Sequence, residues 1–329
     1  MPPGFCYTES KEAMGLRFWK GSVIRMKLGF VSAILGELSF EEMMDFASEN
    51  GFECVEVCCW PKGKAERRYA GVTHINVDEV DEAKAAYIKD YCAKKGVEIS
   101  ALAYYPNTMD PDLEKRAVYI NHIKKLIKAA KLLGVATVNT FVGRDPHKNV
   151  DENIEIFKEV WPPIIRFAEE NGIRIGIENC PMLFSNDEWP GGQNLMTTPA
   201  IWRRLFEIIP SKNFGLNYDP SHFVWQQMDY IKPLYEFKDR IFHVHYKDIK
   251  IFPDKLREVG IMATPLQYMS PKLPGLGDVD WGKYVSALTD IGYDGYTCIE
   301  VEDKAFEKNL DDVKKSILLS RNYMRQFVL

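Results

Sequence analysis

Eight short apolar runs, each followed by a longer amphipathic stretch, constrain the fold of this chain more than any other feature. The runs cover residues 27–33, 53–59, 98–104, 137–142, 174–179, 214–219, 241–247 and 296–302. Apolar runs of this length are typical of buried strands. Strands that alternate with helices form a parallel sheet, because each crossover needs a long connection to return the chain.

The stretches between the runs carry helix signals. Ser39, followed by Glu42 three residues later, predicts a capping box at the start of the first helix. Further helices are expected over residues 79–95, 111–133, 151–170, 198–208, 229–237, 281–291 and 309–326. Eight such units without a break in composition predict an α/β fold with a single (β/α)₈ barrel over residues 26–329. A doubly wound sheet is the alternative, but no G-x-G-x-x-G follows the first run.

Residues 1–25 precede the first run and have no continuous apolar segment, so we expect an N-terminal extension and not a signal peptide. No stretch approaches the ~18 apolar residues of a membrane span. Seven cysteines, an odd number in a large chain, favour the reducing cytoplasm over a disulfide framework. We expect a cytoplasmic protein in which Cys58 and Cys59 are small buried side chains.

The charge balance limits the partners. The chain has 42 Lys and Arg against 47 Asp and Glu, so the formal net charge is 42 − 47 = −5. Nucleic-acid-binding proteins usually carry a basic surface. We therefore expect a small-molecule substrate, and neither nucleic acid nor a membrane, as the partner. The sequence leaves open whether the protein is a homo-oligomer and whether a small partner subunit completes the site.

Polar side chains able to bind a metal or move a proton follow four consecutive strands. In order along the chain they are Glu178 and Asn179, Asp219 and His222, then His243, His245 and Lys247, and finally Glu300. In a barrel the carboxyl ends of the strands form the rim that carries the catalytic site. Two Glu, one Asp and one imidazole favour Mn²⁺, Mg²⁺ or Co²⁺. Alternation puts both histidines of H-x-H on one face, and either can point inward.

The segments IENCP, LNYDPSH, FHVHYKD, PGLGDVDW and CIEVE resemble those of the xylose-isomerase-like TIM barrels, over about residues 26–327. That group includes sugar-phosphate isomerases, D-tagatose/D-psicose 3-epimerases, inosose dehydratases and endonuclease IV. The resemblance implies one divalent metal, Mn²⁺ before Mg²⁺ or Co²⁺, held by Glu178, Asp219, His245 and Glu300. It also implies that His222 contacts the substrate, and it leaves His243 as the alternative ligand.

By the same resemblance, the protein is expected to be a metal-dependent sugar isomerase or epimerase. Glu178 and Glu300 would then exchange a proton next to a metal-bound carbonyl, through a metal-stabilised enediolate. Lys247 would stabilise a developing oxyanion, or alternatively form a surface ion pair with Asp248. Endonuclease IV activity is disfavoured, because the histidines of its further metal sites are missing after residues 53–59 and 98–104.

Other strand ends look like a sugar-binding surface. We expect substrate contacts from Asn179 and Lys247, and also from Trp60, Tyr104, Asn107, Arg144 and His147. The alternative for His147 is a solvated loop histidine.

An insert at residues 249–273 departs from the compact 3-epimerases. Loops of this length are usually functional, and we expect Met262, Leu266, Tyr268 and Met269 to cover an aryl or glycosyl group. Chains with this insert also look similar to the large subunits of C-glycoside deglycosidases. A lyase that acts on a 3-oxo-glycoside by β-elimination is therefore the alternative function, and a non-catalytic sugar-binding barrel is the second alternative.

Overall fold

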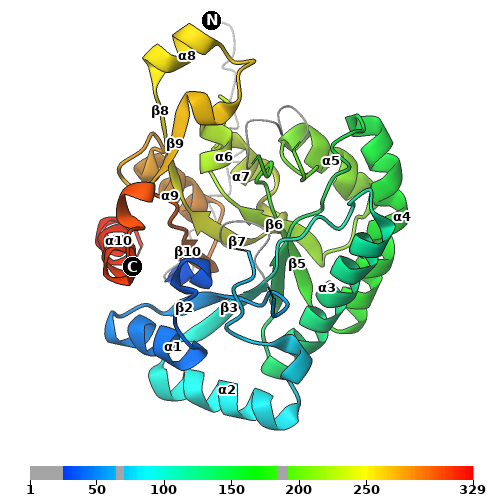
Figure 1. The fold of residues 1–329 in the computed structure, drawn as a ribbon, viewed down its shortest axis with the longest axis vertical. Coiled ribbons are helices and arrows are strands. Elements are labelled where there is room, and N and C mark those ends of the chain that lie inside the picture. Colours follow the sequence, from blue (N-terminus) through cyan, green and yellow to red (C-terminus); the bar gives the residue numbers. More distant parts are fainter. Residues whose placement is uncertain (1–24, 64–69, 184–191, 329) are drawn as a thin grey trace, which may run out of the picture.

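The computed structural model describes residues 25–63, 70–183 and 192–328. Within them, eight parallel strands close into a barrel in the order β1-β10-β7-β6-β5-β4-β3-β2 (Figure 1). The barrel strands are β1 (Lys27–Val31), β2 (Cys54–Cys58), β3 (Glu98–Ala103), β4 (Thr137–Thr140), β5 (Arg174–Glu178), β6 (Phe214–Tyr218), β7 (Ile241–Tyr246) and β10 (Tyr296–Ile299). The predicted α/β class and (β/α)₈ barrel are confirmed, and each strand lies within its expected run. Residues 1–24, nearly all of the expected N-terminal extension, lie outside the described residues.

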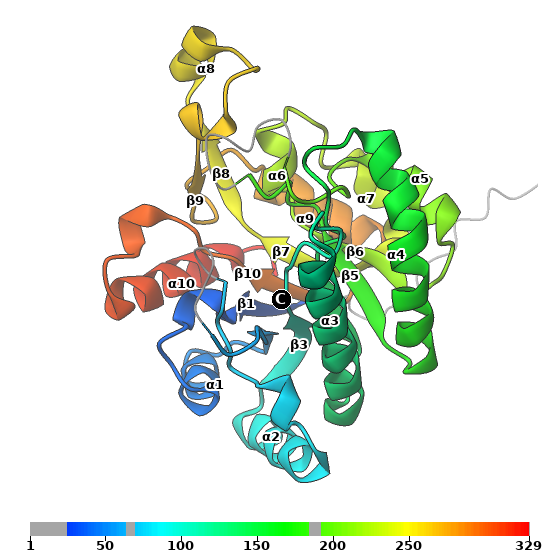
Figure 2. The same cartoon turned by 45° about the vertical axis from the view of Figure 1, so that its right-hand side comes forward.

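Helices surround the barrel (Figures 1 and 2). They are α1 (Phe40–Glu49), α2 (Glu82–Lys95), α3 (Leu113–Leu133), α4 (Val150–Glu170), α5 (Pro199–Ile208), α6 (Ser221–Val224), α7 (Lys232–Glu236), α9 (Trp281–Asp290) and α10 (Leu310–Met324). The predicted capping box is present: Ser39 Oγ accepts from the Glu42 main-chain N–H at 3.1 Å, and Glu42 Oε2 accepts from the Ser39 N–H at 2.8 Å. Among the described helices, none has the length and apolar character needed to cross a membrane.

Large aromatic side chains fill the layer between the strands and the helices, including the fully buried Trp161, Trp202 and Trp281. Cys58 and Cys59 are buried, as expected for small apolar side chains.

The insert after β7 forms an arm. β8 (Asp248–Ile251) pairs antiparallel with β9 (Met269–Lys272), and α8 (Pro253–Val259) lies at the outer end of the arm, beyond the barrel (Figures 1 and 2). Of the four residues expected to cover a ligand, the structure speaks against Tyr268 alone, and the role of Met262, Leu266 and Met269 stays a prediction. Tyr268 is only 3% exposed and is unavailable to a ligand, whereas Met262 is 78% exposed on the segment that follows α8. Pairing between β8 and β9 satisfies the main chain at the base of the arm.

Asp248 ties the base of the arm to the segment PGLGDVDW. Its carboxylate accepts hydrogen bonds of 2.9–3.2 Å from the main-chain N–H groups of Gly275, Gly277 and Val279 and from the indole N–H of Trp281. A Cβ atom on Gly277 would lie 2.2 Å from Asp248 Oδ1, so the close approach requires glycine. The segments FHVHYKD and PGLGDVDW therefore form one structural unit.

Replacing Asp248 with alanine should destabilise the protein by about 2–4 kcal/mol, because several buried donors would lose their acceptor. Urea unfolding followed by circular dichroism measures the change. Asp254→Ala is the matched control, because this carboxylate on α8 is 96% exposed, and it should change stability by less than ~0.5 kcal/mol. An equally small effect of Asp248→Ala would contradict the anchoring role.

Candidate metal centre

Four donor residues from neighbouring barrel strands converge at the carboxyl-terminal rim. Glu178 ends β5, Asp219 follows β6, His245 lies on β7 and Glu300 follows β10. Each offers one ligand atom, and the four atoms lie within 4.8 Å of one another. His245 Nδ1 is 3.0 Å from Glu300 Oε2 and 3.9 Å from Glu178 Oε1. The structure thus brings together the four residues expected to bind a metal.

Three of these ligand atoms have unused bonding capacity. Asp219 Oδ2, His245 Nδ1 and Glu300 Oε2 are buried and make no hydrogen bond of regular geometry within the described part of the chain. Their polar contacts include the ion pairs of His245 with Glu300, at 3.0 Å, and of His222 with Asp219, at 3.2 Å. Buried polar atoms normally have hydrogen-bond partners, so a cluster of atoms without regular hydrogen bonds fits a bound ion. Three carboxylates and one imidazole suit a divalent cation that prefers oxygen and nitrogen ligands.

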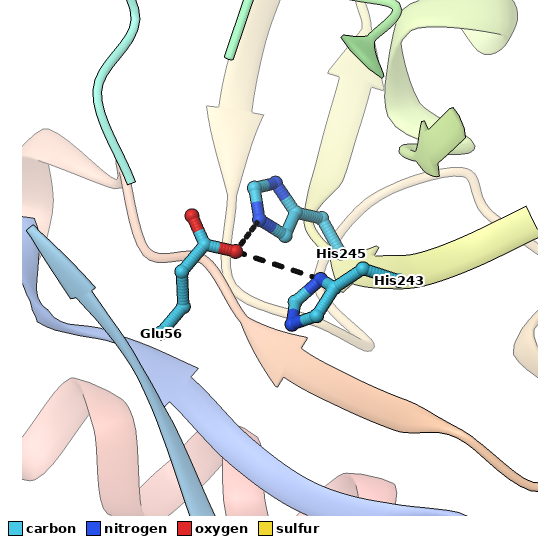
Figure 3. A group of neighbouring side chains, drawn as sticks. All are labelled: Glu56, His243 and His245. Atoms are coloured by element: carbon cyan, nitrogen blue, oxygen red, sulfur yellow. Dashed lines mark hydrogen bonds and ion pairs between the residues drawn. The ribbon is translucent and has the colours of Figure 1, made fainter. Parts of the chain in front are cut away.

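The two histidines of β7 have different surroundings. His243 is fully buried, with Nδ1 3.0 Å from Asn217 Oδ1 and Nε2 3.0 Å from Ser100 Oγ. Both of its nitrogens are therefore engaged inside the barrel. His245 Nε2 lies 2.8 Å from Glu56 Oε2 (Figure 3). This contact leaves Nδ1 for the donor cluster. This geometry favours His245 over His243 as the ligand.

Sequence reasoning missed Glu56, which lies in the middle of β2 and is fully buried. The available signal was a single charged residue between Val55 and Val57 in an otherwise apolar strand. A charge at such a position needs partners, because burying it alone is costly. Its partners come from other strands, and nothing in the local sequence indicates which ones.

Lys247 is only 4% exposed, so the alternative of a surface ion pair with Asp248 is wrong. Its ammonium group lies 3.2 Å from Glu302 Oε2, 3.3 Å from Glu300 Oε1 and 3.8 Å from Asp219 Oδ2. Burial opposes the charged form, but these carboxylates raise the pKa of Lys247 well above its ordinary value. Lys247 therefore places a fixed positive charge beside the donor cluster.

His222 on α6 also faces the donor cluster. Its Nε2 lies 3.2 Å from Asp219 Oδ2 and 3.5 Å from Glu178 Oε1. The indole N–H of Trp225 donates to Nδ1 at 3.3 Å, which leaves the proton of the imidazole on Nε2. Burial lowers the pKa of His222, but the neighbouring Cys180 and Asp219 outweigh it and raise that pKa. His222 therefore presents a proton and not a free lone pair.

Three residues expected to contact the substrate are instead engaged with the protein. Both ends of the Asn179 side-chain amide bind the main chain of Asp219, at 2.8 and 2.9 Å. The Asn107 amide binds the main chain of Arg144 in the same way, at 2.7 and 2.8 Å. Tyr104 is buried and packs edge-on against Trp60, with ring centroids 4.8 Å apart. These contacts hold the rim loops together, so they do not support a direct role in binding.

The other expected substrate contacts lie nearer to the surface. Trp60 and Arg144 are half-buried, and His147 is exposed in the loop after β4. The Nε of Arg144 is buried without a hydrogen-bond partner in the described residues. Substrate contacts from these three residues stay a prediction.

Comparison with known proteins identifies the architecture that carries this site. Residues 44–323 match the xylose isomerase-like TIM barrels. The chain belongs to this family. YfiH of Bacillus subtilis (strain 168) is 27% identical over 313 residues, which cover 84% of this chain and 93% of YfiH. An inosose dehydratase of Clostridium perfringens (strain ATCC 13124) is 28% identical over 297 residues, with 87% and 93% covered.

Solved structures of low sequence identity share the fold. The IolI protein with a bound zinc atom has a TM-score of 0.68 at 18% identity, with 92% of this chain and 98% of IolI covered. D-psicose 3-epimerase in the presence of D-fructose has a TM-score of 0.65 at 15% identity, with 92% and 99% covered.

The two glutamates of this xylose isomerase-like site have opposite pKa shifts. Burial and the repulsion of Glu300 raise the pKa of Glu178. Burial also acts to raise the pKa of Glu300, but the charges of Lys247 and His245 outweigh it and lower that pKa to about 2. A pair of carboxyl groups with separated pKa values is typical of an acid and base pair.

Binding of a divalent metal to this xylose isomerase-like site should strengthen as the pH rises. Burial opposes protonation of His245, but Glu56 and Glu300 raise its pKa well above the ordinary value of about 6.5. The metal-free protein therefore keeps a second proton on the His245 ring at pH values above 6.5, and a metal that binds Nδ1 must displace this proton. Below the raised pKa, the affinity for Mn²⁺ should increase about tenfold per pH unit. Titration calorimetry in two buffers of different ionisation enthalpy should detect one released proton, and a pH-independent affinity would contradict this account.

Proposed function

We propose that this protein is a divalent-metal-dependent enzyme that moves a proton at a carbon next to a carbonyl group of a sugar-like small molecule, with isomerisation or epimerisation as the outcome. The observation that carries the proposal is the buried set of three carboxylates and one imidazole, three of whose ligand atoms make no hydrogen bond of regular geometry in the described chain. The shared fold with D-psicose 3-epimerase supports the same class of reaction.

Glu178, Asp219, His245 and Glu300 would hold the metal, for which we propose Mn²⁺, with Mg²⁺ and Co²⁺ as alternatives. When bound, a divalent metal polarises a carbonyl oxygen and stabilises the negative charge that develops there. We propose that Glu178 and Glu300 exchange a proton with the carbon next to this carbonyl, one accepting it and the other returning one. A carboxylate on either side of the substrate is what inversion at a single carbon requires.

Lys247 and His222 give the site two further donors. The Lys247 ammonium is 3.5 Å from His222 Nε2, and both groups lie close to Asp219. We propose that they bind hydroxyl or carbonyl oxygens of the substrate and orient it against the two glutamates.

A second candidate function is elimination from an oxidised sugar or cyclitol, such as a 3-oxo-glycoside. Elimination breaks a C–H bond next to the carbonyl and a bond from the next carbon to the leaving group, and forms a C=C bond. The leaving oxygen or carbon then needs a proton, which His222 Nε2 is placed to supply. The similarity to inosose dehydratases favours this candidate.

Incubation of the Mn²⁺-loaded protein in D₂O with ketoses, keto-cyclitols and 3-oxo-glucosides tests both candidates. Incorporation of deuterium at carbon without release of a fragment is the expected result for isomerisation or epimerisation. Release of water or of an aglycone indicates elimination. Glu178→Gln should lower the rate of either reaction by about 10²–10⁴-fold, because the variant cannot transfer a proton.

The control is Glu155→Gln, which changes an exposed carboxylate on α4 and should leave the rate unchanged. Exchange that persists in EDTA, or that survives Glu178→Gln, would contradict the proposal. If wild-type protein binds sugars but catalyses neither exchange nor elimination with any member of the panel, the barrel is a binding protein.

A further inference from the structure

We infer that Glu56 is a positioning residue for His245: its carboxylate binds the Nε2–H of His245, so that Nδ1 faces the metal ligands Glu178 and Glu300. The inference rests on the proposed metal-dependent function. Glu56 would support the site from a distant part of the barrel without binding the metal itself. It lies on β2, which β1 and β10 separate from β7 in the strand order.

The contacts of Glu56 are those of an ionised carboxylate held in one place. Its Oε2 lies 2.8 Å from His245 Nε2 and accepts from the Asn139 side-chain N–H at 2.8 Å. Its Oε1 accepts from the Tyr105 hydroxyl at 2.5 Å. Glu56 is fully buried, and Figure 3 shows its carboxylate directed at the ring of His245. Glu56 Oε2 also lies 3.5 Å from His243 Nδ1 (Figure 3). Contacts from β7, from β4 and from the end of β3 therefore fix this side chain.

A competing contact defines the tautomer. Asn217 Oδ1 accepts from His243 Nδ1, which turns the Asn217 amide nitrogen toward His245 Nε2 at 2.9 Å and toward the Tyr105 hydroxyl oxygen at 3.2 Å. His245 Nε2 can donate to Glu56 or accept from Asn217, but not both. If it accepted, its lone pair would face a carboxylate oxygen at 2.8 Å. The charge-assisted bond to Glu56 is the stronger one, and Asn217 has the Tyr105 oxygen as its acceptor.

The contact between Glu56 and His245 Nε2 determines the state of the other ring nitrogen of His245, Nδ1. Glu300 Oε2 lies 3.0 Å from Nδ1, so in the metal-free protein a proton lies between these two atoms. With a divalent metal in its place, the imidazole keeps its proton on Nε2, toward Glu56, and its lone pair on Nδ1. A carboxylate behind the imidazole also makes the nitrogen that binds metal more basic and holds the ring in its orientation. Without Glu56, the ring can rotate or take the opposite tautomer.

Glu56→Gln tests the inference with little change in volume. We expect affinity for Mn²⁺, measured by titration calorimetry, to fall about 10–100-fold, the usual effect of removing such an outer partner. The visible absorption of bound Co²⁺ should also change, because it reports the ligand set directly and does not depend on turnover.

Two control variants separate positioning from general damage. Glu98→Gln makes the same chemical change on β3, where the carboxylate pairs with Lys27 at the protein surface, and it should leave metal affinity unchanged. Tyr105→Phe removes a donor to Glu56 and also the oxygen that accepts from Asn217, which can then compete for His245 Nε2. Its loss of metal affinity should be smaller than that of Glu56→Gln, because the Glu56 carboxylate keeps its charge and its contact with His245. If Glu56→Gln does not fold, Glu56→Asp, which keeps the charge but withdraws it from His245, takes its place.

The possible failures are distinguishable. Wild-type protein that binds no Mn²⁺ would overturn the proposed function and this inference with it. Wild-type protein that binds Mn²⁺, together with a folded Glu56→Gln that binds within threefold of it and gives the same Co²⁺ spectrum, would overturn only the role of Glu56. An equal loss of affinity in Tyr105→Phe and Glu56→Gln would indicate a purely structural network.

Discussion

Mutual repulsion between three buried carboxylates is the constraint on which the site depends. Glu178, Asp219 and Glu300 present oxygen atoms within 4.8 Å of one another. Two unit charges 4 Å apart near a protein surface interact by about 4 kcal/mol, so such a cluster needs positive charge. Lys247 and the proton of His222 supply part of it. The ligand atoms that make no regular hydrogen bond within the described residues account for the rest if a divalent cation binds among them.

His243 and His245 on β7, and Lys247 directly after this strand, have three different roles. His243 is bonded to Asn217 and Ser100 inside the barrel. His245, two residues on, reaches the donor cluster, and Lys247 at the rim neutralises its carboxylates. The period of two along a strand places these side chains on one face, at successive depths. A single segment, FHVHYK, therefore runs from the polar interior of the barrel to the mouth of the site.

Much of the fold and of the donor set could be predicted from the sequence because both depend on local patterns. Apolar runs gave the eight strands, and polar residues at their ends gave Glu178, Asp219 and Glu300. The sequence could not show the direction of an amide side chain at the end of a strand. Asn179 and Asn107, both expected to contact the substrate, bind the main chain instead. The sequence could not pair Glu56 with His245, 189 positions away. It indicated the insert at residues 249–273 but not the pairing of β8 with β9, because these strands are short and lack regular alternation.

The central claim is that one divalent metal binds Glu178, Asp219, His245 and Glu300. The most direct measurement is a crystal structure of the protein grown with Mn²⁺, with anomalous data collected at the manganese edge. We expect one strong anomalous peak at bonding distance, about 2.0–2.3 Å, from a carboxylate oxygen of each acid and from His245 Nδ1. A peak bound through His243, or no peak at this rim at a Mn²⁺ concentration that saturates other sites, would contradict it.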